Sequence, residues 1–231
     1  LGTLYMGNMG QGSYQIRGSL FLDLNENGQR DLNEPPVPDQ WIAIDPSDAG
    51  ANSYSTGEYV VLCSAGAHTV QPPSSFLEGG IWALTTPADY QVVLTTSNTV
   101  SAANDFGITP ILDMAQLDIT CTRGETWCGG EMPIWITIKN IGTRSDGGTI
   151  RLSLDDRFTL SSFEPFDALI EDTTLLWQFG PLAPFQSLHF KVHLISPNVE
   201  SMGTEAYFRT EVHTLDETGN STGTFASDLT W

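Results

Sequence analysis

The residues best suited to chemistry by their types and spacing lie between positions 23 and 34. Oxygen-bearing side chains fall at positions one, three, five, nine and twelve of this segment, and position seven would offer a backbone carbonyl. These candidate ligands are Asp23, Asn25, Asn27, Gln29, Asp31 and Glu34, with Gly28 at position six, where the chain must turn sharply. Because Ca²⁺ takes six to eight oxygens at about 2.3–2.6 Å, the pattern predicts a calcium loop. The alternative is an ordinary polar turn rich in Asp and Asn.

The flanks indicate what kind of loop this is. Upstream, apolar and polar side chains alternate from residue 14 to residue 22, which is the period of a β-strand. Downstream, Pro35-Pro36 follows Glu34 directly, and a helix cannot continue through these prolines without losing amide donors. The sequence therefore predicts a loop between two strands. Calcium would act there as a structural clamp on a β-domain, not as a sensor between two helices.

Composition limits the class of protein. The chain has 231 residues, 40% of them hydrophobic, which is enough for two ordinary domains with real cores. Its net charge of −19 argues against binding to nucleic acid or to anionic membranes. No segment approaches the roughly 20 apolar residues of a membrane span. No secretion signal is recognisable and the chain begins at Leu1, so we expect a processed or excised piece of a longer protein.

The first part of the chain is predicted to be a β-sandwich. Residues 1–13 have no apolar period and are expected to form a linker or an exchanged end strand. Residues 14–108 contain short apolar segments separated by turn clusters such as 45–50 and 72–75. The expected strands are Ile16–Leu22, Trp41–Ile44, Glu58–Leu62, His68–Gln71, Ile81–Leu84, Tyr90–Thr95 and Asn104–Ile108.

A second β-sandwich is predicted for residues 112–231, after a short stiff joint at Thr109-Pro110. Apolar side chains alternate with polar ones in four segments of this part, and nothing reads as a helix of three turns. The alternating segments are Ile134–Lys139, Ile150–Asp155, Leu175–Phe179 and Leu188–Leu194. The fold class expected for the whole chain is all-β, with two tandem Ig-like antiparallel sandwiches.

Three cysteines are present. Cys121 and Cys128 are separated by six residues around a turn, so a hairpin disulfide between them is one expectation, and two free thiols are the alternative. Cys63 follows an apolar run and is expected to be a small buried residue, not a reactive thiol.

The first unit resembles the B-repeat domains of serine-aspartate repeat surface proteins, which are related to the collagen-adhesin B-type module. The matching residues are Ile16–Asp23, Asn25–Asp31 with Glu34-Pro35, Ser55–Tyr59, Ala65–Gly66 with His68–Val70, and Asn104–Gly107. The resemblance covers about 95 residues and implies a calcium-stabilised, Ig-like stalk or spacer on a bacterial surface. The loop between Ile44 and Tyr59 lacks the richer acidic turn of many members. The set of lysine, acid and asparagine that forms an isopeptide bond in some relatives is not recognisable.

The second unit resembles the conserved-repeat Ig-like domains of large secreted bacterial surface proteins, especially those exported by the type IX system. The resembling stretches are Ile136–Gly142, Gly148–Leu152 with Asp155, and Trp177–Pro184. The resemblance covers about 115 residues and implies a structural or adhesive role without catalysis.

Other residues were weighed as sites. His189 and His193 would share one face of a strand with Lys191 between them, where a solvated face is favoured over a zinc site. The segment 216–220 could bind a second cation, although a plain hairpin is the simpler interpretation. Asp105 could approach the calcium loop. The tryptophans Trp41, Trp82 and Trp135 could form a sugar-stacking surface, with core filling as the default.

These observations predict a calcium-rigidified structural segment of a large extracellular bacterial surface protein, and not an enzyme. The sequence has neither a Gly-x-Ser-x-Gly elbow nor a glycine loop suited to phosphate. Expected partners are neighbouring domains of the same chain or assembly. The alternatives are an adhesin that binds a glycan or a protein, a filament subunit whose residues 1–13 complete a neighbour's sheet, and an accessory module of a secreted enzyme.

Overall fold

The computed structural model describes residues 14–46, 49–76, 80–198, 203–216 and 218–230. The chain divides into two compact units, Leu1–Leu112 and Asp113–Trp231. The division falls just after the Thr109-Pro110 joint. The segment 1–13, expected to be a linker or an exchanged strand, lies outside the described residues. Within those residues there is no α-helix, and the one helical element is the short 3₁₀ turn η1 (Ser74–Phe76).

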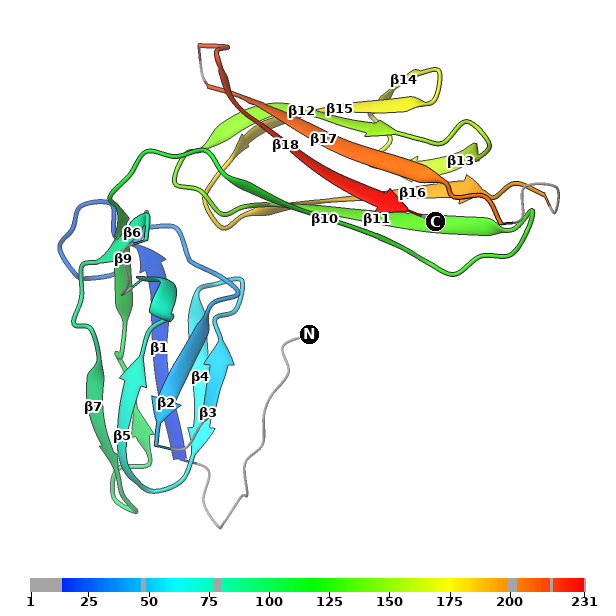
Figure 1. Cartoon of the computed structure of the whole chain (residues 1–231). Coiled ribbons are helices and arrows are strands. Elements are labelled where there is room, and N and C mark those ends of the chain that lie inside the picture. Colours follow the sequence, from blue (N-terminus) through cyan, green and yellow to red (C-terminus); the bar gives the residue numbers. More distant parts are fainter. Residues whose placement is uncertain (1–13, 47–48, 77–79, 199–202, 217, 231) are drawn as a thin grey trace. The chain divides into compact units, whose positions relative to one another are not determined.

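The described residues of the first unit form nine short strands, most of which are labelled in Figure 1. They are β1 (Tyr14–Leu22), β2 (Trp41–Asp45), β3 (Ala49–Asn52), β4 (Glu58–Cys63), β5 (Gly66–Gln71), β6 (Trp82–Leu84), β7 (Tyr90–Leu94), β8 (Val100–Ser101) and β9 (Phe106–Pro110). One sheet has the order β4-β1-β9-β6, with β8 also beside β1, and the other has the order β3-β2-β5-β7. The sequence-based expectation of purely antiparallel sheets is wrong in one respect, because β1 pairs in parallel with β8 and β9.

Alternation along the strands forms the core of the first unit. Ile42 and Ile44 of β2 are 0% and 1% exposed, whereas Trp41 and Asp45 on the same strand are exposed. Successive side chains of a strand point to opposite faces, so each sheet contributes one apolar face to the interior. β1 is buried along most of its length because sheet neighbours flank it on both sides.

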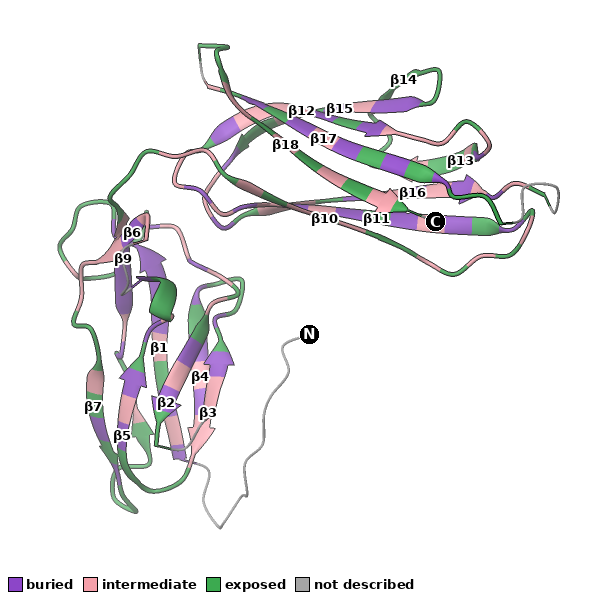
Figure 2. Ribbon diagram, viewed as in Figure 1, coloured by how far each residue is buried: buried purple, intermediate pink, exposed green. Residues whose placement is uncertain are grey.

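The part of the second unit that the structure describes also contains nine strands. They are β10 (Leu117–Arg123), β11 (Glu131–Asn140), β12 (Asp146–Ser153), β13 (Thr159–Glu164), β14 (Leu169–Glu171), β15 (Thr174–Leu182), β16 (Ser187–Ile195), β17 (Tyr207–Leu215) and β18 (Ser221–Thr230). One sheet has the order β10-β11-β16-β13 and the other has the order β14-β15-β12-β17-β18. All pairings within these two sheets are antiparallel. Figure 2 shows the alternation of buried and exposed residues along β17.

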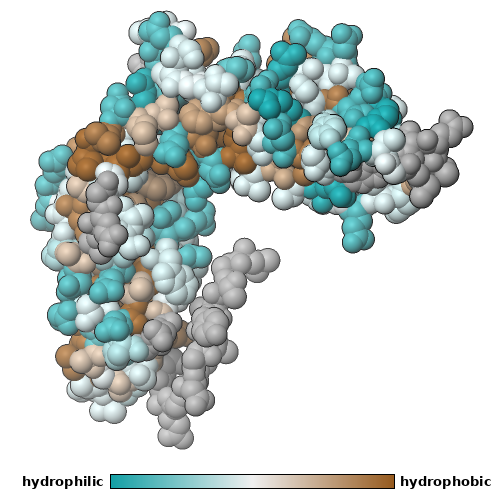
Figure 3. Space-filling model, viewed as in Figure 1, coloured by the Kyte–Doolittle hydropathy of each residue, from teal (hydrophilic) through white to brown (hydrophobic). Residues whose placement is uncertain are grey.

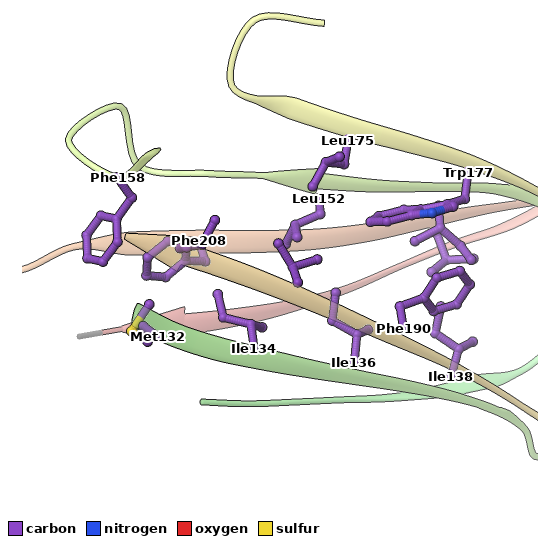
Figure 4. Close-up of a cluster of buried hydrophobic side chains, with 14 of the residues drawn as sticks. Met132, Ile134, Ile136, Ile138, Leu152, Phe158, Leu175, Trp177, Phe190 and Phe208 are labelled. Atoms are coloured by element: carbon purple, nitrogen blue, oxygen red, sulfur yellow. The ribbon is translucent and has the colours of Figure 1, made fainter. Parts of the chain in front are cut away.

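The core of the second unit lies between its two sheets. Ile134, Ile136 and Ile138 of β11 are fully buried and point towards the opposite sheet (Figure 4). There they face Leu152 of β12 and Trp177 of β15. Each side chain of this kind, when fully buried, contributes about 1.5–3 kcal/mol to folding. Each unit is thus an Ig-like β-sandwich with its own core, as the sequence predicted.

The surface of the chain exposes large apolar side chains as well as polar ones (Figure 3). Of the three tryptophans considered for sugar stacking, Trp82 is buried at 6% exposure, while Trp41 and Trp135 are 44% and 42% exposed. Core filling therefore explains Trp82 but neither of the other two. In the described part of the chain, no helix is long and apolar enough to cross a membrane.

Candidate metal centre

The predicted calcium loop connects β1 to β2, so the expectation of a loop between strands is confirmed. Its two ends are held together by the hydrogen bond from the Leu22 amide to the Pro35 carbonyl, at 2.9 Å. Its start is fixed to the end of β9, because the Asp23 amide donates to the Ile108 carbonyl at 2.9 Å. Asp23 is 0% exposed and Glu34 is 8% exposed, whereas most residues between them are exposed. The segment is therefore a closed surface loop with two buried carboxylates at its base.

Asp23 organises the first half of the loop. Its Oδ1 accepts from the Asn27 amide at 3.1 Å, and its Oδ2 accepts from the Gly28 amide at 2.7 Å. Burial acts to raise the pKa of Asp23. The Thr85 hydroxyl, which lies nearby outside good hydrogen-bond geometry, and the loop amides outweigh that effect, so the pKa of Asp23 is lower than its ordinary value. Asp23 is thus held as a carboxylate that shapes the backbone.

The sharp turn at position six has the expected cause. Gly28 has φ of +71°, the left-handed region that glycine occupies without steric cost. A methyl group there would lie 3.3 Å from the Thr85 carbonyl oxygen, so the turn also lies close to the β6–β7 connection. Glu26, two residues earlier, takes φ of 58° as well. The sequence signal for the turn was therefore correct.

The side chains at loop positions three, five and nine converge. The Nδ2 atoms of Asn25 and Asn27 donate to one oxygen of Asp31, at 2.8 and 3.0 Å. The Oδ1 atoms of Asn25 and Asn27 accept from the backbone amides of Asn27 and Gln29, at 3.1 and 2.7 Å. Three of the predicted ligands therefore lie within hydrogen-bond distance of one another at one point of the loop.

Glu34 closes the second half of the loop. Its Oε1 accepts from the Leu24 amide and its Oε2 accepts from the Asp31 amide, each at 3.0 Å. The Glu34 carboxylate thus connects Leu24, Asp31 and its own position at the end of the loop. The backbone amide of Gln29 donates to Asn27 Oδ1. Among the described residues, no hydrogen bond involves the Gln29 side chain.

The carboxylates of the loop do not gather. Among the described residues, no three or more His, Cys, Asp or Glu side chains form a group that could hold a metal ion. Asp23 and Glu34 face backbone amides, and only Asp31 faces the two asparagines. The donor set still fits a hard cation, because carboxylate and amide oxygens suit Ca²⁺. A half-turn of each asparagine amide would bring its oxygen to the point of convergence, and it would also break the bonds that the two Oδ1 atoms accept from the backbone amides of Asn27 and Gln29.

Three contacts from distant residues support the loop, and the sequence analysis missed them. The Thr109 hydroxyl donates to Glu26 Oε1 at 3.3 Å, and the Arg30 guanidinium donates to the Thr56 carbonyl at 2.7 Å. The third is Thr85, beside Asp23. Thr109 and Glu26 are 83 positions apart in the sequence, so no local spacing could have revealed their contact.

Asp105 does not join the loop. Its Oδ1 accepts from the amide and from the hydroxyl of Ser19, each at 2.7 Å. Next to it, the buried Tyr59 hydroxyl donates to the Asn104 carbonyl at 2.5 Å, and the Asn104 side chain donates to the Arg17 carbonyl at 2.9 Å. These bonds fasten the start of β9 to β1. The residue expected near the metal is therefore part of a structural clasp.

The cysteines are free thiols. Cys121 lies in β10 opposite Ile136, and its side chain packs against the core of the second unit. Burial raises the pKa of the thiols of Cys121 and Cys63, which makes both less reactive. The hairpin disulfide expected between Cys121 and Cys128 is absent, because Cys121 points into the sandwich and Cys128 lies in the turn after β10.

The other candidate sites have structural roles. His189 and His193 lie on β16 with Lys191 between them, as predicted. His189 Nδ1 is 3.1 Å from the Thr137 hydroxyl, and His193 Nδ1 is 3.0 Å from Glu131 without hydrogen-bond geometry. In the segment 216–220, Asp216 accepts from the amides of Thr218 and Asn220 at 2.9 Å each. The Thr218 hydroxyl, which donates to Asp216 Oδ1 at 2.7 Å, is the main cause that lowers the pKa of Asp216 to about 2, and the two amides add to it. These contacts are those of a hairpin loop.

Comparisons with known proteins were made for the whole chain. No family model matches it, and no curated protein matches it. BcpA, the major pilin subunit of Bacillus cereus, is 9% identical with a TM-score of 0.43, and the match covers 95% of this chain and 68% of that chain. The major pilin SpaD of Corynebacterium diphtheriae is 11% identical with a TM-score of 0.39, covering 96% of this chain and 68% of that chain.

A third similar structure covers part of the chain. ACE19, the collagen-binding subdomain of the Enterococcus faecalis surface protein ACE, is 9% identical with a TM-score of 0.36. That match covers 48% of this chain and 92% of ACE19. At such identities the likeness is one of β-fold only. The expected kinship with serine-aspartate repeat B domains and with type IX surface proteins stays a prediction.

Proposed function

We propose that the chain is a structural segment of an extracellular bacterial surface protein, in which Ca²⁺ bound by residues 23–34 rigidifies the first unit. The observation that carries the proposal is the convergence of Asn25, Asn27 and Asp31 within a loop whose ends are closed by two buried carboxylates. To present oxygens at that point, the two amide groups must rotate and give up the bonds that they accept from the Asn27 and Gln29 amides, and binding of the ion would have to offset this loss.

Each predicted ligand has a defined part in this proposal. Asp31 would supply a carboxylate, Asn25 and Asn27 would supply amide oxygens, and Gln29 would supply its backbone carbonyl. Asp23 and Glu34 would add carboxylate oxygens while they keep their bonds to loop amides. When bound, Ca²⁺ supplies positive charge that offsets the repulsion among three carboxylates.

The mechanical effect follows from what the loop touches. Its start and Glu26 are bonded to Ile108 and Thr109 of β9, and Arg30 is bonded to the turn before β4. Fixing the loop therefore fixes β9 and that turn to one another. A segment stiffened in this way suits a spacer or stalk, whose expected partners are neighbouring domains of the same long chain or assembly. We further propose that the chain performs no catalysis.

Calorimetric titration with CaCl₂ and thermal melting with and without EDTA test the proposal. We expect a Kd in the range of extracellular modules, about 10⁻⁴–10⁻³ M. At a tenfold excess of calcium over Kd, the folded state gains about 1.4 kcal/mol, which raises the melting temperature. Asp31→Asn removes the carboxylate at the point of convergence without removing a bond from the loop base, and it should abolish most of the calcium effect.

Asp216→Asn is the matched control, because this carboxylate also organises an exposed loop of Asp and Asn, but in the second unit. It should leave the calcium-dependent shift unchanged. Equal melting temperatures with CaCl₂ and with EDTA for the unaltered chain would contradict the proposed function. A shift that survives Asp31→Asn in full would place the ion elsewhere.

A further inference from the structure

Trp41 is placed on the outer face of a sheet, away from the core. It begins β2, and because Ile42 and Ile44 point inward, the side chains of residues 41, 43 and 45 point outward. Its indole ring covers Gly50 of the neighbouring strand β3. A methyl group at residue 50 would lie only 2.4 Å from Cζ2 and 2.6 Å from Cε2 of the ring. One side of the indole therefore lies against the backbone of β3, and Trp41 remains 44% exposed.

The residues around Trp41 are small or carry neutral hydrogen-bonding groups. Asn52 is directly opposite Trp41 in the β2–β3 register, and Gln71 is directly opposite Ala43 in the β2–β5 register. Both side chains are exposed, and within the described residues no hydrogen bond involves either side-chain amide. Between these residues lie Gly50 and Ala43, whose side chains are absent or small, so nothing there rises above the surface of the sheet. The arrangement is a shallow platform with an exposed aromatic ring and unpaired amide groups beside it.

This face differs in charge from the rest of the first unit. Residues 1–112 contain 11 Asp and Glu and two Arg, so their net charge is 2 − 11 = −9. The outward residues of the four strands include one carboxylate, that of Asp45. These outward residues are Trp41, Ala43, Asp45, Gly50, Asn52, Ala67, Thr69, Gln71, Gln91 and Val93. Gln91 Nε2 also donates to Asp89 Oδ1 at 3.0 Å, just before β7. A face that is mostly uncharged on a unit of net charge −9 favours an uncharged polar partner, because an anionic polymer would be repelled by the unit as a whole.

We propose that the outer face of the sheet β3-β2-β5-β7 binds a neutral polysaccharide, with Trp41 as its stacking residue. The free side of the indole would lie against the apolar face of a sugar ring, since a flat aromatic ring offers a large rigid contact surface. Asn52 and Gln71 would donate to and accept from sugar hydroxyl groups, because each amide has both functions. Thr69 and Gln91, which are bonded to each other at 3.1 Å, extend the polar row across the sheet.

An apolar protein surface fits this face less well. Burying the amides of Asn52 and Gln71 against apolar groups would leave their donors and acceptors unpaired, which costs free energy. A sugar would form hydrogen bonds with the two amides and would also stack on the indole. The proposal is independent of calcium binding, since none of these residues belongs to the loop 23–34.

Affinity electrophoresis tests the proposal with the full chain in calcium-containing buffer. The neutral probes are mixed-linkage β-glucan, glucomannan, dextran and yeast mannan, and the anionic probes are polygalacturonate and alginate. We expect at least one neutral probe to retard the chain. Trp41→Ala should weaken that binding by about tenfold or more, equivalent to about 1.4 kcal/mol. Trp41→Phe, which keeps a smaller flat ring, should have an intermediate affinity.

Trp127→Ala is the matched control. Trp127 is 74% exposed and its ring also covers a glycine, Gly130, but it lies in a turn of the second unit. This variant should bind as the unaltered chain does, and far-UV circular dichroism should show that every variant is folded. Retardation by none of the four neutral probes, or only by the anionic ones, would overturn the proposal. So would unchanged binding by Trp41→Ala.

Discussion

Asp23 and Glu34 show how burial determines what a carboxylate does. A buried charge is costly unless it is hydrogen-bonded, and each of these groups accepts two bonds, mostly from amides of its own loop. Their first role is therefore to fold the loop. Asp31 differs, because its oxygen accepts from two side-chain amides and not from the backbone. This difference makes Asp31 the informative residue to change when calcium binding is tested.

Asp155 plays a comparable organising role in the second unit. Its Oδ2 accepts from Arg157 Nη2 at 2.7 Å, and its Oδ1 accepts from Arg157 Nε at 2.8 Å. Arg157 also donates to the Glu205 carbonyl, and the Tyr207 amide donates to Asp155 at 3.3 Å. The pair thus connects the β12–β13 turn to the start of β17. The Arg157 guanidinium holds the pKa of Asp155 below its ordinary value.

This pair predicts acid sensitivity of the second unit. Because the folded-state pKa of Asp155 is lowered, its stabilising contribution is complete above the unfolded pKa of about 3.9 and is lost as the pH falls through the folded value. Asp155→Asn should destabilise the second unit by about 1.5–3 kcal/mol at pH 7. The variant should also lose less stability than the unaltered chain between pH 6 and pH 3, as measured by urea denaturation at each pH.

Asp167→Asn is the control for this experiment, since Asp167 is exposed in the same unit. It should leave both the stability at pH 7 and its pH dependence nearly unchanged. Parallel pH profiles for the unaltered chain and Asp155→Asn would contradict the assigned role of Asp155.

At the scale of the elements, the sequence predicted the strands that bury an apolar face. The expected strands around Ile134–Lys139 and Leu188–Leu194 correspond to β11 and β16, which pair with each other in the middle of a sheet. It missed β17, although Phe208 and Val212 of that strand are buried, and it also did not predict β14 or β18. All three residues of β14 are exposed and β18 has no fully buried residue, because both are edge strands that leave little apolar periodicity in the sequence.

A turn expected at residues 45–50 was partly wrong for a related reason. β3 begins at Ala49 and pairs with β2 through small residues, Ala49, Gly50 and Ala51. Alanine and glycine are weak strand formers, so pairing with a neighbour decides their conformation, which sequence alone does not show. Gly50 is required there because the Trp41 ring lies over it.

The loop 23–34 was predictable in its ligand spacing because all its positions lie in one short segment. The contacts that hold it in place were not predictable, since Thr85 in the β6–β7 connection and Thr109 in β9 lie far from it in the sequence. Even inside the loop, the spacing did not reveal that Asp23 and Glu34 face amides while the two asparagines face Asp31. The spacing shows in which order the oxygen-bearing residues occur, but it does not show which rotamers their side chains adopt.

Two glycines of the second unit are expected to differ in how much their replacement by alanine costs, because only one of them lies close to a neighbouring strand. A methyl group at Gly148 in β12 would lie 2.0 Å from the His213 carbonyl of β17, whereas one at Gly180 would meet nothing within 4 Å. Gly148→Ala should destabilise the second unit by about 1–3 kcal/mol, because the two strands must move apart. Gly180→Ala should change stability by no more than about 0.5 kcal/mol in urea denaturation. Equal effects of the two substitutions would show that β12 and β17 do not approach so closely.

At the scale of the whole molecule, both units are acidic and each has its own core. The first carries a net charge of −9, and the second carries the remaining −10 of the total of −19. Like charges close together destabilise a compact state, and a bound divalent cation lowers that repulsion. The proposed calcium site lies in the first unit only, so the ion should act unequally on the two.

Differential scanning calorimetry of the full chain tests this unequal effect. Ile42→Val in the first unit and Ile136→Val in the second each remove one methyl group from a fully buried side chain. Each should cost about 0.5–1.5 kcal/mol and lower the transition of its own unit by several degrees, which assigns the transitions. Adding CaCl₂ should raise the transition that Ile42→Val lowers and leave the other in place. If calcium instead raises the transition that Ile136→Val lowers, the stabilising ion is bound in the second unit and the loop 23–34 is not its site.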